Sequence, residues 1–319
     1  MKNTCRVCNN TEGNNHYRAK EMMYGLREDF DYFECANCGC LQIVDFPADM
    51  SKYYPGDYYS FYQYDGKKFE GLKGAIKKKQ YALSALGGKS FWSTIGKLIG
   101  KKEYRIFSQL NVNRETRILD VGCGNGRNFQ YPLAEIGFRN LLGCDPYLPD
   151  DIHYPNGLEI KKSEVFEVEG KWDMITYHHS FEHLPNPKEH LKKVHGLLDV
   201  DGVCIIRIPT VSSYAWEHYK EKWVQLDAPR HFFLHSNKSM TLLAEELGFD
   251  LYKIDDDANH FQFTGSEKYL NDIPLSAPKD KGILASIKRK WKNYKYNKKA
   301  KRLNRLGKGD QSAFYFRKK

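Results

Sequence analysis

Hydrophobic positions along the chain follow two alternating patterns from residue 116 onward. Short apolar runs rich in β-branched residues alternate with segments whose apolar residues recur at the three- and four-residue spacing of amphipathic helices. This alternation predicts an α/β fold in which a mainly parallel sheet is covered by helices on both faces. We expect strands at 117–121, 141–144, 158–161, 173–177, 203–208, 249–255 and 312–316, and helices at 127–136, 187–198 and 238–247.

The first forty residues carry a different pattern, in which two Cys-x-x-Cys pairs flank a polar and aromatic stretch long enough for a hairpin. The pairs are Cys5 with Cys8 and Cys35 with Cys38. The spacing predicts a zinc ribbon, because four thiolates in two such pairs can close a tetrahedron around one Zn²⁺ ion. A closed site of this kind has no position for substrate, so we expect structural zinc. The alternatives are four unrelated buried cysteines, or Cys40 as a competing ligand.

The composition narrows the class of protein further. Of the 319 residues, 41% are hydrophobic and 28% are charged, which excludes a fibre or a disordered chain and fits one full-sized domain with appendages. The longest apolar runs are far shorter than the roughly 20 residues that span a bilayer, and the N-terminus has no apolar signal core. We therefore expect a cytoplasmic protein whose eight cysteines stay reduced.

A glycine-rich loop, GCGNG at 122–126, follows the first of these strands and precedes a predicted helix. Such a loop lets a ligand approach bare backbone and the helix N-terminus. The dinucleotide fingerprint would need glycine at position 127, which is Arg127. The spacing, preceded by LDV at 119–121, instead resembles the cofactor loop of class I S-adenosylmethionine-dependent methyltransferases.

An acidic residue at the tip of the next strand strengthens this resemblance. The sequence LLGCD ends at Asp145, where a carboxylate can accept both ribose hydroxyls of an adenosyl ligand. The alternative is that Asp145 is a turn residue before Pro146. The predicted cofactor-binding residues are Asp120, Gly122, Gly124, Gly126, Asp145 and Tyr177.

Longer strings extend the resemblance to a particular group of methyltransferases. With the four N-terminal cysteines, the strings RILDVGCGNG, WDMITYHHSFEHLPNP, DGVCIIRIP and LDAPRHFFLHS resemble zinc-ribbon methyltransferases of bacterial polysaccharide clusters, and sugar C-methyltransferases. The similarity covers about residues 1–64 and 110–266, and GDQSAFYFRK matches the terminal strand. It implies a Rossmann-like, doubly wound sheet of seven strands with the last antiparallel. It also implies S-adenosylmethionine as cofactor and a nucleotide-linked or lipid-linked sugar as acceptor.

The resemblance also nominates catalytic residues. In that family the loop after the fourth strand and a later Pro-Arg-His loop face the methyl group, which points to His179, Glu182, His183 and His231. A hydroxyl or enolisable carbon must lose a proton as it is methylated, and a histidine whose pKa lies near 6.5 can accept it. One histidine alone is more often structural, but a cluster on two loops at one sheet edge favours a catalytic member.

Two other interpretations of the same loop are open. The string HSFEH at 179–183 fits the inverted metalloprotease motif H-x-x-E-H, but that motif needs an uninterrupted helix, and Pro185 and Pro187 follow at once. Quinone O-methyltransferases of similar fold carry E-x-x-E-H here and bind a divalent ion. In this chain His179 replaces the first acid, which is a poor match for Mg²⁺. A catalytic metal is therefore possible but not predicted.

Acceptor binding is predicted for aromatic residues and one arginine. The tyrosine-rich segment 53–64 either joins the zinc module to the main domain or forms a lid over the substrate. Arg230 could pair with a substrate phosphate or could hold Asp227 in place. The candidate substrate residues are Tyr54, Tyr58, Tyr59, Trp223 and Arg230.

The net charge of +10 is concentrated in two basic segments. Residues 281–319 hold 15 Lys or Arg and one acid, and residues 67–105 hold 11 Lys or Arg and two acids. Within 281–306, Ile283, Ile287, Trp291 and Tyr294 fall on one face of a possible helix, which suits an anionic membrane surface, although a solvated helix also fits. Nucleic acid is the less favoured partner, and an RNA-binding protein or RNA methyltransferase is the alternative function.

The predicted organisation has five parts. These are a zinc ribbon at 1–48, a tyrosine-rich lid and basic connector at 49–110, the methyltransferase domain at 111–264, a basic helical insertion at 265–309 and the last strand at 310–319.

Overall fold

The computed structural model describes residues 3–54, 63–86, 104, 107, 110, 112–278 and 281–319. The chain divides into two compact units. The first consists of Met1–Pro55, His179–His195 and Ile205–Lys319, and the second of Gly56–His178 and Gly196–Cys204.

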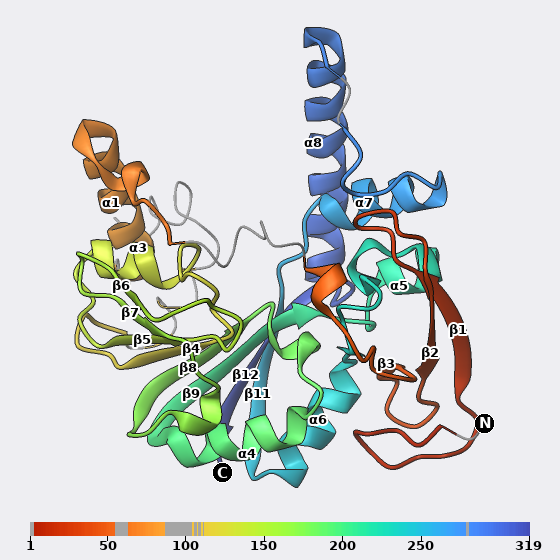
Figure 1. Ribbon diagram of the computed structural model, residues 1–319, viewed down its shortest axis with the longest axis horizontal. Coiled ribbons are helices and arrows are strands. Elements are labelled where there is room, and N and C mark those ends of the chain that lie inside the picture. The colour runs from red at the N-terminus through yellow and green to blue at the C-terminus, as the bar shows by residue number, and fades with distance from the viewer. Residues whose placement is uncertain are drawn as a thin grey trace. The chain divides into compact units, whose positions relative to one another are not determined.

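A large twisted sheet forms the framework (Figure 1), and its strand order is β11-β12-β9-β8-β4-β5-β7-β6. All seven predicted strands are present, and the Rossmann-like α/β fold with an antiparallel end strand is confirmed. Their bounds are β4 Ile118–Val121, β5 Leu141–Cys144, β7 Glu159–Lys161, β8 Trp172–His178, β9 Leu198–Pro209, β11 Phe249–Asp256 and β12 Gln311–Lys318. The eighth strand, β6 (Ile152–His153), is a two-residue edge strand antiparallel to β7.

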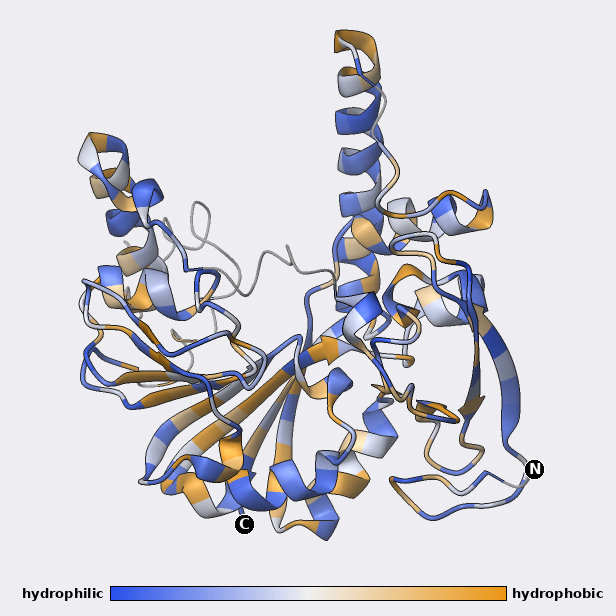
Figure 2. Ribbon diagram, in the orientation of Figure 1, coloured by the Kyte–Doolittle hydropathy of each residue, from blue (hydrophilic) through white to orange (hydrophobic). Residues whose placement is uncertain are grey.

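Parallel pairing places the ends of four strands together in the second unit. β4 pairs in parallel with both β5 and β8, and β5 pairs in parallel with β7. All four residues of β4 are buried, as a strand covered on both faces requires. Figure 2 shows these strands as mostly hydrophobic. The described residues of this unit form the helices α1 (Gly71–Leu86) and α3 (Gln130–Glu135) and the short 3-10 segments Lys67–Phe69 and Val165–Glu167.

A second, smaller sheet belongs to the first unit and has the order β1-β2-β3-β10. The hairpin of β1 (Asn15–Lys20) and β2 (Asp29–Glu34) continues into β3 (Leu41–Ile43). β10 (Phe233–Leu234) then pairs with β3, with Leu234 opposite Leu41. The cysteine-containing segment therefore shares its sheet with residues that follow His231 directly in the chain.

The remaining helices of the first unit are α4 (Pro187–Leu197), α5 (Tyr214–Tyr219), α6 (Asn237–Glu246), α7 (Phe261–Leu270) and α8 (Ile283–Arg305). Its 3-10 segments are Ser51–Tyr53, Phe181–His183, Lys220–Lys222 and Val224–Leu226. The predicted basic helix is confirmed as α8, of which only Ala300 is buried. None of the helices among the described residues is long and apolar enough to cross a bilayer.

Candidate active site

The glycine loop after β4 adopts a backbone conformation that few other residues would tolerate. Gly122, Gly124 and Gly126 all have φ between +54° and +68°. A Cβ atom on Gly126 would lie 2.6 Å from Cδ1 of Ile160. The loop can therefore turn tightly and present bare backbone only because these positions lack side chains.

Asp145 turns toward this loop, as we expected. Its Oδ2 accepts the amide N–H of Gly124 at 2.8 Å, and its Oδ1 accepts the amide N–H of Tyr147 at 3.0 Å. A carboxylate in this position can accept ribose hydroxyls. The loop and the acid together fit an adenosyl cofactor.

The other two predicted cofactor residues are buried. Asp120 accepts the hydroxyl of Thr176 at 2.7 Å, and burial raises the pKa of its carboxyl group to about 7. Tyr177 has no exposed surface, and burial raises the pKa of its hydroxyl group well above the ordinary value. Asp120 thus contacts β8 beneath the loop, and Tyr177 forms part of the core of the second unit.

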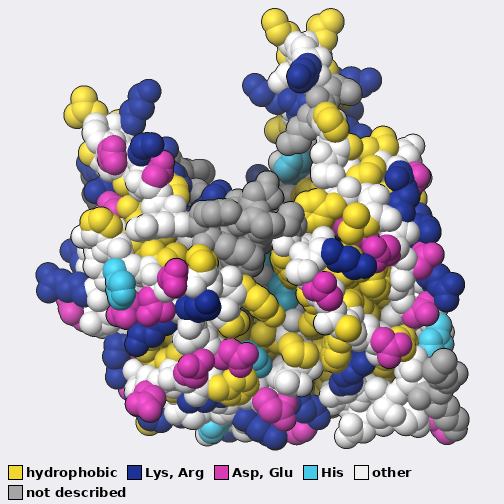
Figure 3. Space-filling model, viewed as in Figure 1, with side chains coloured by type: hydrophobic (Ala, Val, Ile, Leu, Met, Phe, Trp, Pro, Cys, Tyr) yellow, Lys and Arg dark blue, Asp and Glu magenta, His cyan; other side chains and the backbone are white. Residues whose placement is uncertain are grey.

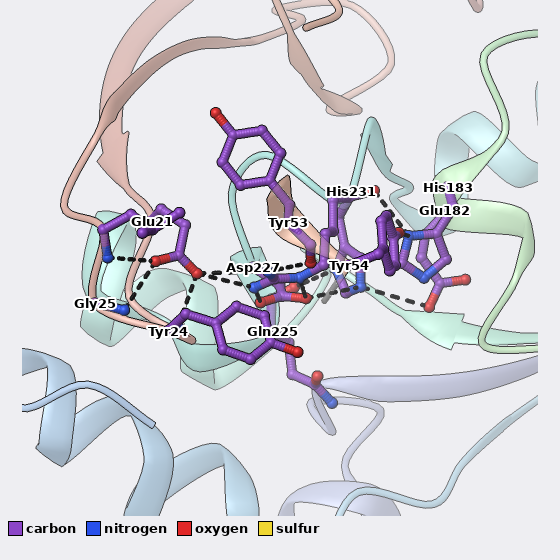
Figure 4. Close-up of polar contacts among 12 residues, drawn as sticks. Glu21, Tyr24, Gly25, Tyr53, Tyr54, Glu182, His183, Gln225, Asp227 and His231 are labelled. Atoms are coloured by element: carbon purple, nitrogen blue, oxygen red, sulfur yellow. Dashed lines mark hydrogen bonds and ion pairs between the residues drawn. The ribbon is translucent and has the colours of Figure 1, made fainter. Parts of the chain in front are cut away.

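The predicted catalytic histidines lie around one buried carboxylate, that of Glu182. Figure 4 shows His183 and His231 beside it. Glu182 is fully buried in the 3-10 segment Phe181–His183, and neither of its carboxylate oxygens accepts a hydrogen bond from the described residues. Nδ1 of His179 lies 3.5 Å and Nε2 of His231 lies 3.9 Å from Oε1. Glu182, His183 and His231 each have one atom, a carboxylate oxygen or a ring nitrogen, that could bind a metal ion, and these three atoms all lie within 4.8 Å of one another.

Backbone carbonyls fix the tautomers of two of these histidines. Nδ1 of His183 lies 2.8 Å from the carbonyl oxygen of Arg230, and Nδ1 of His231 lies 2.8 Å from that of Gln225. A carbonyl oxygen only accepts, so each Nδ1 carries the proton and each Nε2 keeps a lone pair.

Burial and charge also set the protonation of this cluster. Burial alone would raise the pKa of Glu182, but His179, His183 and His231 lower it to about 2. Burial, with a smaller contribution from the charge of His183, lowers the pKa of His231 to about 4. At neutral pH the cluster therefore combines an ionised carboxylate with a neutral His231.

Arg230 holds Asp227 in place, one of the two roles that the sequence left open. Its guanidinium is 2% exposed and pairs with Asp227 and with Glu21, and its Nε donates to Oδ2 of Asp227 at 2.9 Å. Glu21 in turn accepts the amide N–H groups of residues 24–26. The Pro-Arg-His loop is thereby tied to the N-terminal segment by buried charges.

The remaining predicted substrate residues differ in where the structure places them. Tyr54 lies near the cluster, with its hydroxyl 3.2 Å from Nδ1 of His183. Trp223 is fully buried and donates its indole N–H to Asp310 at 3.0 Å, so that donor is used inside the protein. Tyr58 and Tyr59 lie outside the described residues.

Comparison of the sequence with protein families identifies the chain. The family model described as "Methyltransferase domain" matches residues 93–254, just over half of the chain. The chain belongs to this methyltransferase family. It is an S-adenosylmethionine-dependent methyltransferase. A comparison with curated protein sequences finds no match.

The chain is also similar to several solved structures, each at low sequence identity. A mycolic acid cyclopropane synthase complexed with SAH is 15% identical, covering 84% of this chain and all of that chain, with a TM-score of 0.45. A SAM-dependent methyltransferase from Archaeoglobus fulgidus is 20% identical, covering 72% and 100%, with a TM-score of 0.42. A possible histamine N-methyltransferase from Thermotoga maritima is 17% identical, covering 64% and 83%, with a TM-score of 0.40.

The methyltransferase also carries a second group of potential metal ligands, at its N-terminal end. The sulfur atoms of Cys5, Cys8, Cys35 and Cys38 all lie within 4.8 Å of one another, and Cys5 with Cys38 and Cys8 with Cys35 are 3.5 Å apart. Zn–S bonds of about 2.3 Å in a tetrahedron place sulfurs slightly less than 4 Å apart, so the four thiols fit a zinc ion. Cys40 is buried but does not belong to the group.

Sequence reasoning missed three contributors to the active-site cluster. Glu21 carries no motif and reaches Arg230 from more than two hundred residues away. Gln225 contributes only a carbonyl oxygen, which leaves no trace in the residue type. Arg207 donates to Nε2 of His179 at 2.8 Å, and its position on β9, level with the end of β8, could have suggested it.

Proposed function

We propose that this methyltransferase methylates a hydroxyl group or an enolisable carbon of a nucleotide-linked or lipid-linked sugar. The observation that supports the proposal is the buried cluster of Glu182, His183 and His231, with the hydroxyl of Tyr54 beside it. Polar groups at this density suit a hydroxylated acceptor, because each can exchange a hydrogen bond with it. The sugar class itself follows from the resemblance of the sequence to sugar-modifying methyltransferases.

In this proposal His179 accepts the proton of the acceptor. As the new bond to the methyl carbon forms, the carbon–sulfur bond of the cofactor breaks and its electron pair stays on sulfur. His179 is the candidate because its side chain is 38% exposed and its Nδ1 lies 3.5 Å from Glu182, whose charge would stabilise the imidazolium. Its lone-pair nitrogen is Nε2, which now accepts from Arg207 and which the acceptor hydroxyl would engage instead.

Labelled-cofactor mass spectrometry tests the proposal. Nucleotide sugars are incubated with the enzyme and S-adenosylmethionine carrying a deuterated methyl group, and we expect one sugar to gain one labelled methyl. His179→Gln should slow this reaction by about 10²- to 10⁴-fold, the usual contribution of a general base, while S-adenosylhomocysteine still binds. Label appearing in RNA and in no sugar would instead support the alternative function.

We also propose that the four N-terminal cysteines bind one structural Zn²⁺ ion. Their sulfur positions fit a tetrahedral site, and the segment that they close contributes only short strands, β1, β2 and β3, to the small sheet. Zinc would supply much of the free energy that folds this segment.

Finally, we propose that α8 lies on an anionic membrane surface. It holds ten Lys or Arg and no acid. Its exposed apolar residues are Ile283, Leu284, Ile287, Trp291 and Tyr294, and each has between 58% and 83% of its surface exposed. Their spacing puts them on one side of the helix. Figure 3 shows lysine and arginine side chains on both sides of this helix, beside hydrophobic ones. An apolar face flanked by cations is typical of helices that bind acidic lipids.

A further inference from the structure

The buried carboxylate of Glu182 lacks the hydrogen bonds that a buried charge normally accepts, as far as the described residues show. It has no exposed surface, and both of its oxygens are without a hydrogen bond from the described residues. Leaving an ionised group in this state is costly, so buried carboxylates are usually hydrogen-bonded, paired with a cation or bound to a metal ion. The nearest side-chain nitrogens belong to His179 and His231, at 3.5 and 3.9 Å from Oε1, which is too far for a strong hydrogen bond.

The two histidines beside this carboxylate are prepared in the way that metal ligands are. Each imidazole donates Nδ1–H to a backbone carbonyl at 2.8 Å, His183 to Arg230 and His231 to Gln225. Histidines that bind metals almost always make such a hydrogen bond. It fixes the orientation of the ring and leaves the lone pair of Nε2 to bind the metal. The imidazole ring centroids of His183 and His231 are 4.8 Å apart.

The three ligand atoms also lie at a suitable separation. One atom each from Glu182, His183 and His231 falls within 4.8 Å of the other two, and metal–ligand bonds of about 2.1 Å would draw them together by small side-chain movements. Glu182 and His183 stand in the 3-10 segment Phe181–His183, and the left-handed φ of Asp227 (+48°) shapes the turn that carries His231.

We propose that Glu182, His183 and His231 bind one divalent first-row transition-metal ion, such as Mn²⁺, Fe²⁺ or Zn²⁺. Two imidazoles and one carboxylate suit these ions, whereas Mg²⁺ and Ca²⁺ prefer oxygen ligands. Three protein ligands leave coordination positions open for an acceptor oxygen. The site is distinct from the four cysteines, whose thiolates select softer ions.

The use of this metal in catalysis rests on the function proposed above. A bound divalent ion would lower the pKa of an acceptor hydroxyl that it coordinates. His183 and His231 would then act as ligands through Nε2, which leaves His179 as the histidine that takes up the proton.

Electron paramagnetic resonance of Mn²⁺ tests the site on the full chain, because the signal of free Mn²⁺ falls as the ion binds. We expect one saturable Mn²⁺ site per chain, which millimolar Mg²⁺ does not displace. Glu182→Gln and His183→Gln should each weaken Mn²⁺ binding by at least about 100-fold. Asp310→Asn, which removes another buried carboxylate elsewhere in the same unit, should leave Mn²⁺ binding unchanged.

Binding of S-adenosylhomocysteine, measured on the same samples, shows that each protein is folded. Wild-type protein that binds S-adenosylhomocysteine but no saturable Mn²⁺ would overturn the metal site and leave the proposed function standing. Equal Mn²⁺ affinity in wild type and in both ligand variants would also overturn it. Mn²⁺ binding without methylation of any sugar would support the site and contradict the proposed function. His183 is only half-buried, so its variant provides the test if Glu182→Gln does not fold.

Discussion

The backbone amide of Gly124 donates a hydrogen bond of 2.8 Å to the carboxylate of Asp145, which joins the loop after β4 to the end of β5. The acid is held by a second amide, that of Tyr147, at 3.0 Å. Its position is therefore fixed before any ligand arrives, so a ligand that binds to this carboxylate costs little side-chain entropy.

Replacing this acid should reduce cofactor affinity. Asp145→Ala removes the acceptor for two ribose hydroxyls, and hydrogen bonds to a charged acceptor contribute about 1.5–3 kcal/mol each. We expect the affinity for S-adenosylhomocysteine, measured by calorimetry, to fall by about 100-fold or more. Asp150→Ala, which removes an exposed acid five residues further on, is the matched control and should bind normally. Equal affinities in the two variants would contradict the assignment.

The buried charges around Arg230 should matter for stability. Arg230→Met leaves the carboxylates of Asp227 and Glu21 without their cation, and breaking a buried ion pair in this way typically costs about 3–5 kcal/mol. Urea denaturation should show this loss in the free energy of unfolding. Arg18→Met removes an exposed pair with Asp31 and should cost less than about 1 kcal/mol. A small loss in Arg230→Met would favour a substrate-binding role for this arginine instead.

The carboxyl group of Asp310 should make stability depend on pH. Burial raises its pKa to about 7, against about 4 in an unfolded chain. Between these values the native state keeps a proton that the unfolded chain has released, so this group lowers the free energy of unfolding as pH rises from 4 to 7.

The substitution Asp310→Asn removes this dependence of stability on pH. The amide oxygen of the new side chain can still accept the indole N–H of Trp223. At pH 8 the variant should exceed wild type in free energy of unfolding by about 2–4 kcal/mol, while at pH 4 the two should be nearly equal. Urea titrations at several pH values check this, and parallel pH profiles would contradict it.

Zinc content should depend on four of the five cysteines near the N-terminus. Elemental analysis of purified protein should give one zinc per chain in wild type and in Cys40→Ser, and little zinc in Cys35→Ser. Because β10 pairs with β3 and the hydroxyl of Tyr32 donates to the carbonyl oxygen of His231, Cys35→Ser should also weaken Mn²⁺ binding. Equal zinc in the two serine variants would contradict the four-cysteine site.

Membrane association should require the apolar side of α8. We expect the protein to sediment with vesicles rich in phosphatidylserine, and not with phosphatidylcholine alone, because each Lys or Arg near an acidic surface contributes about 1 kcal/mol. Ile283→Asn with Ile287→Asn should weaken binding by about 10- to 100-fold, since each isoleucine loses its apolar burial. Leu306→Asn changes an equally exposed residue beyond the helix and should have little effect. Unchanged sedimentation of the double variant would contradict the proposal.

Regular elements were predictable from the sequence where their pattern was long. The run at 118–121 and the segment at 283–305 both appear as expected, because several residues repeat one periodicity. Helix α3 begins at Gln130 rather than at the predicted Arg127, because residues 127–129 still belong to the turn after the glycine loop. Strands β6 and β10 have two residues each, too few to form a pattern, and only tertiary pairing defines them.

The residues of the candidate site also divide into those that a sequence motif predicts and those that only the fold brings together. His179, Glu182 and His183 stand in one motif, and the sequence pointed to them and to His231 together. Glu21 could not be found in this way, because its partner Arg230 is brought to it by the fold alone. The tautomers of His183 and His231 depend on carbonyl oxygens, which every residue type possesses, so no sequence pattern encodes them.

The position of β12 has a consequence for synthesis on the ribosome. This strand lies between β11 and β9, yet it follows α8 in the chain. While the chain is being translated, β9 and β11 must therefore wait with unpaired backbone edges until the whole cationic helix has emerged. During that interval the nascent sheet is open to mispairing, and the helix is already available to any acidic surface nearby.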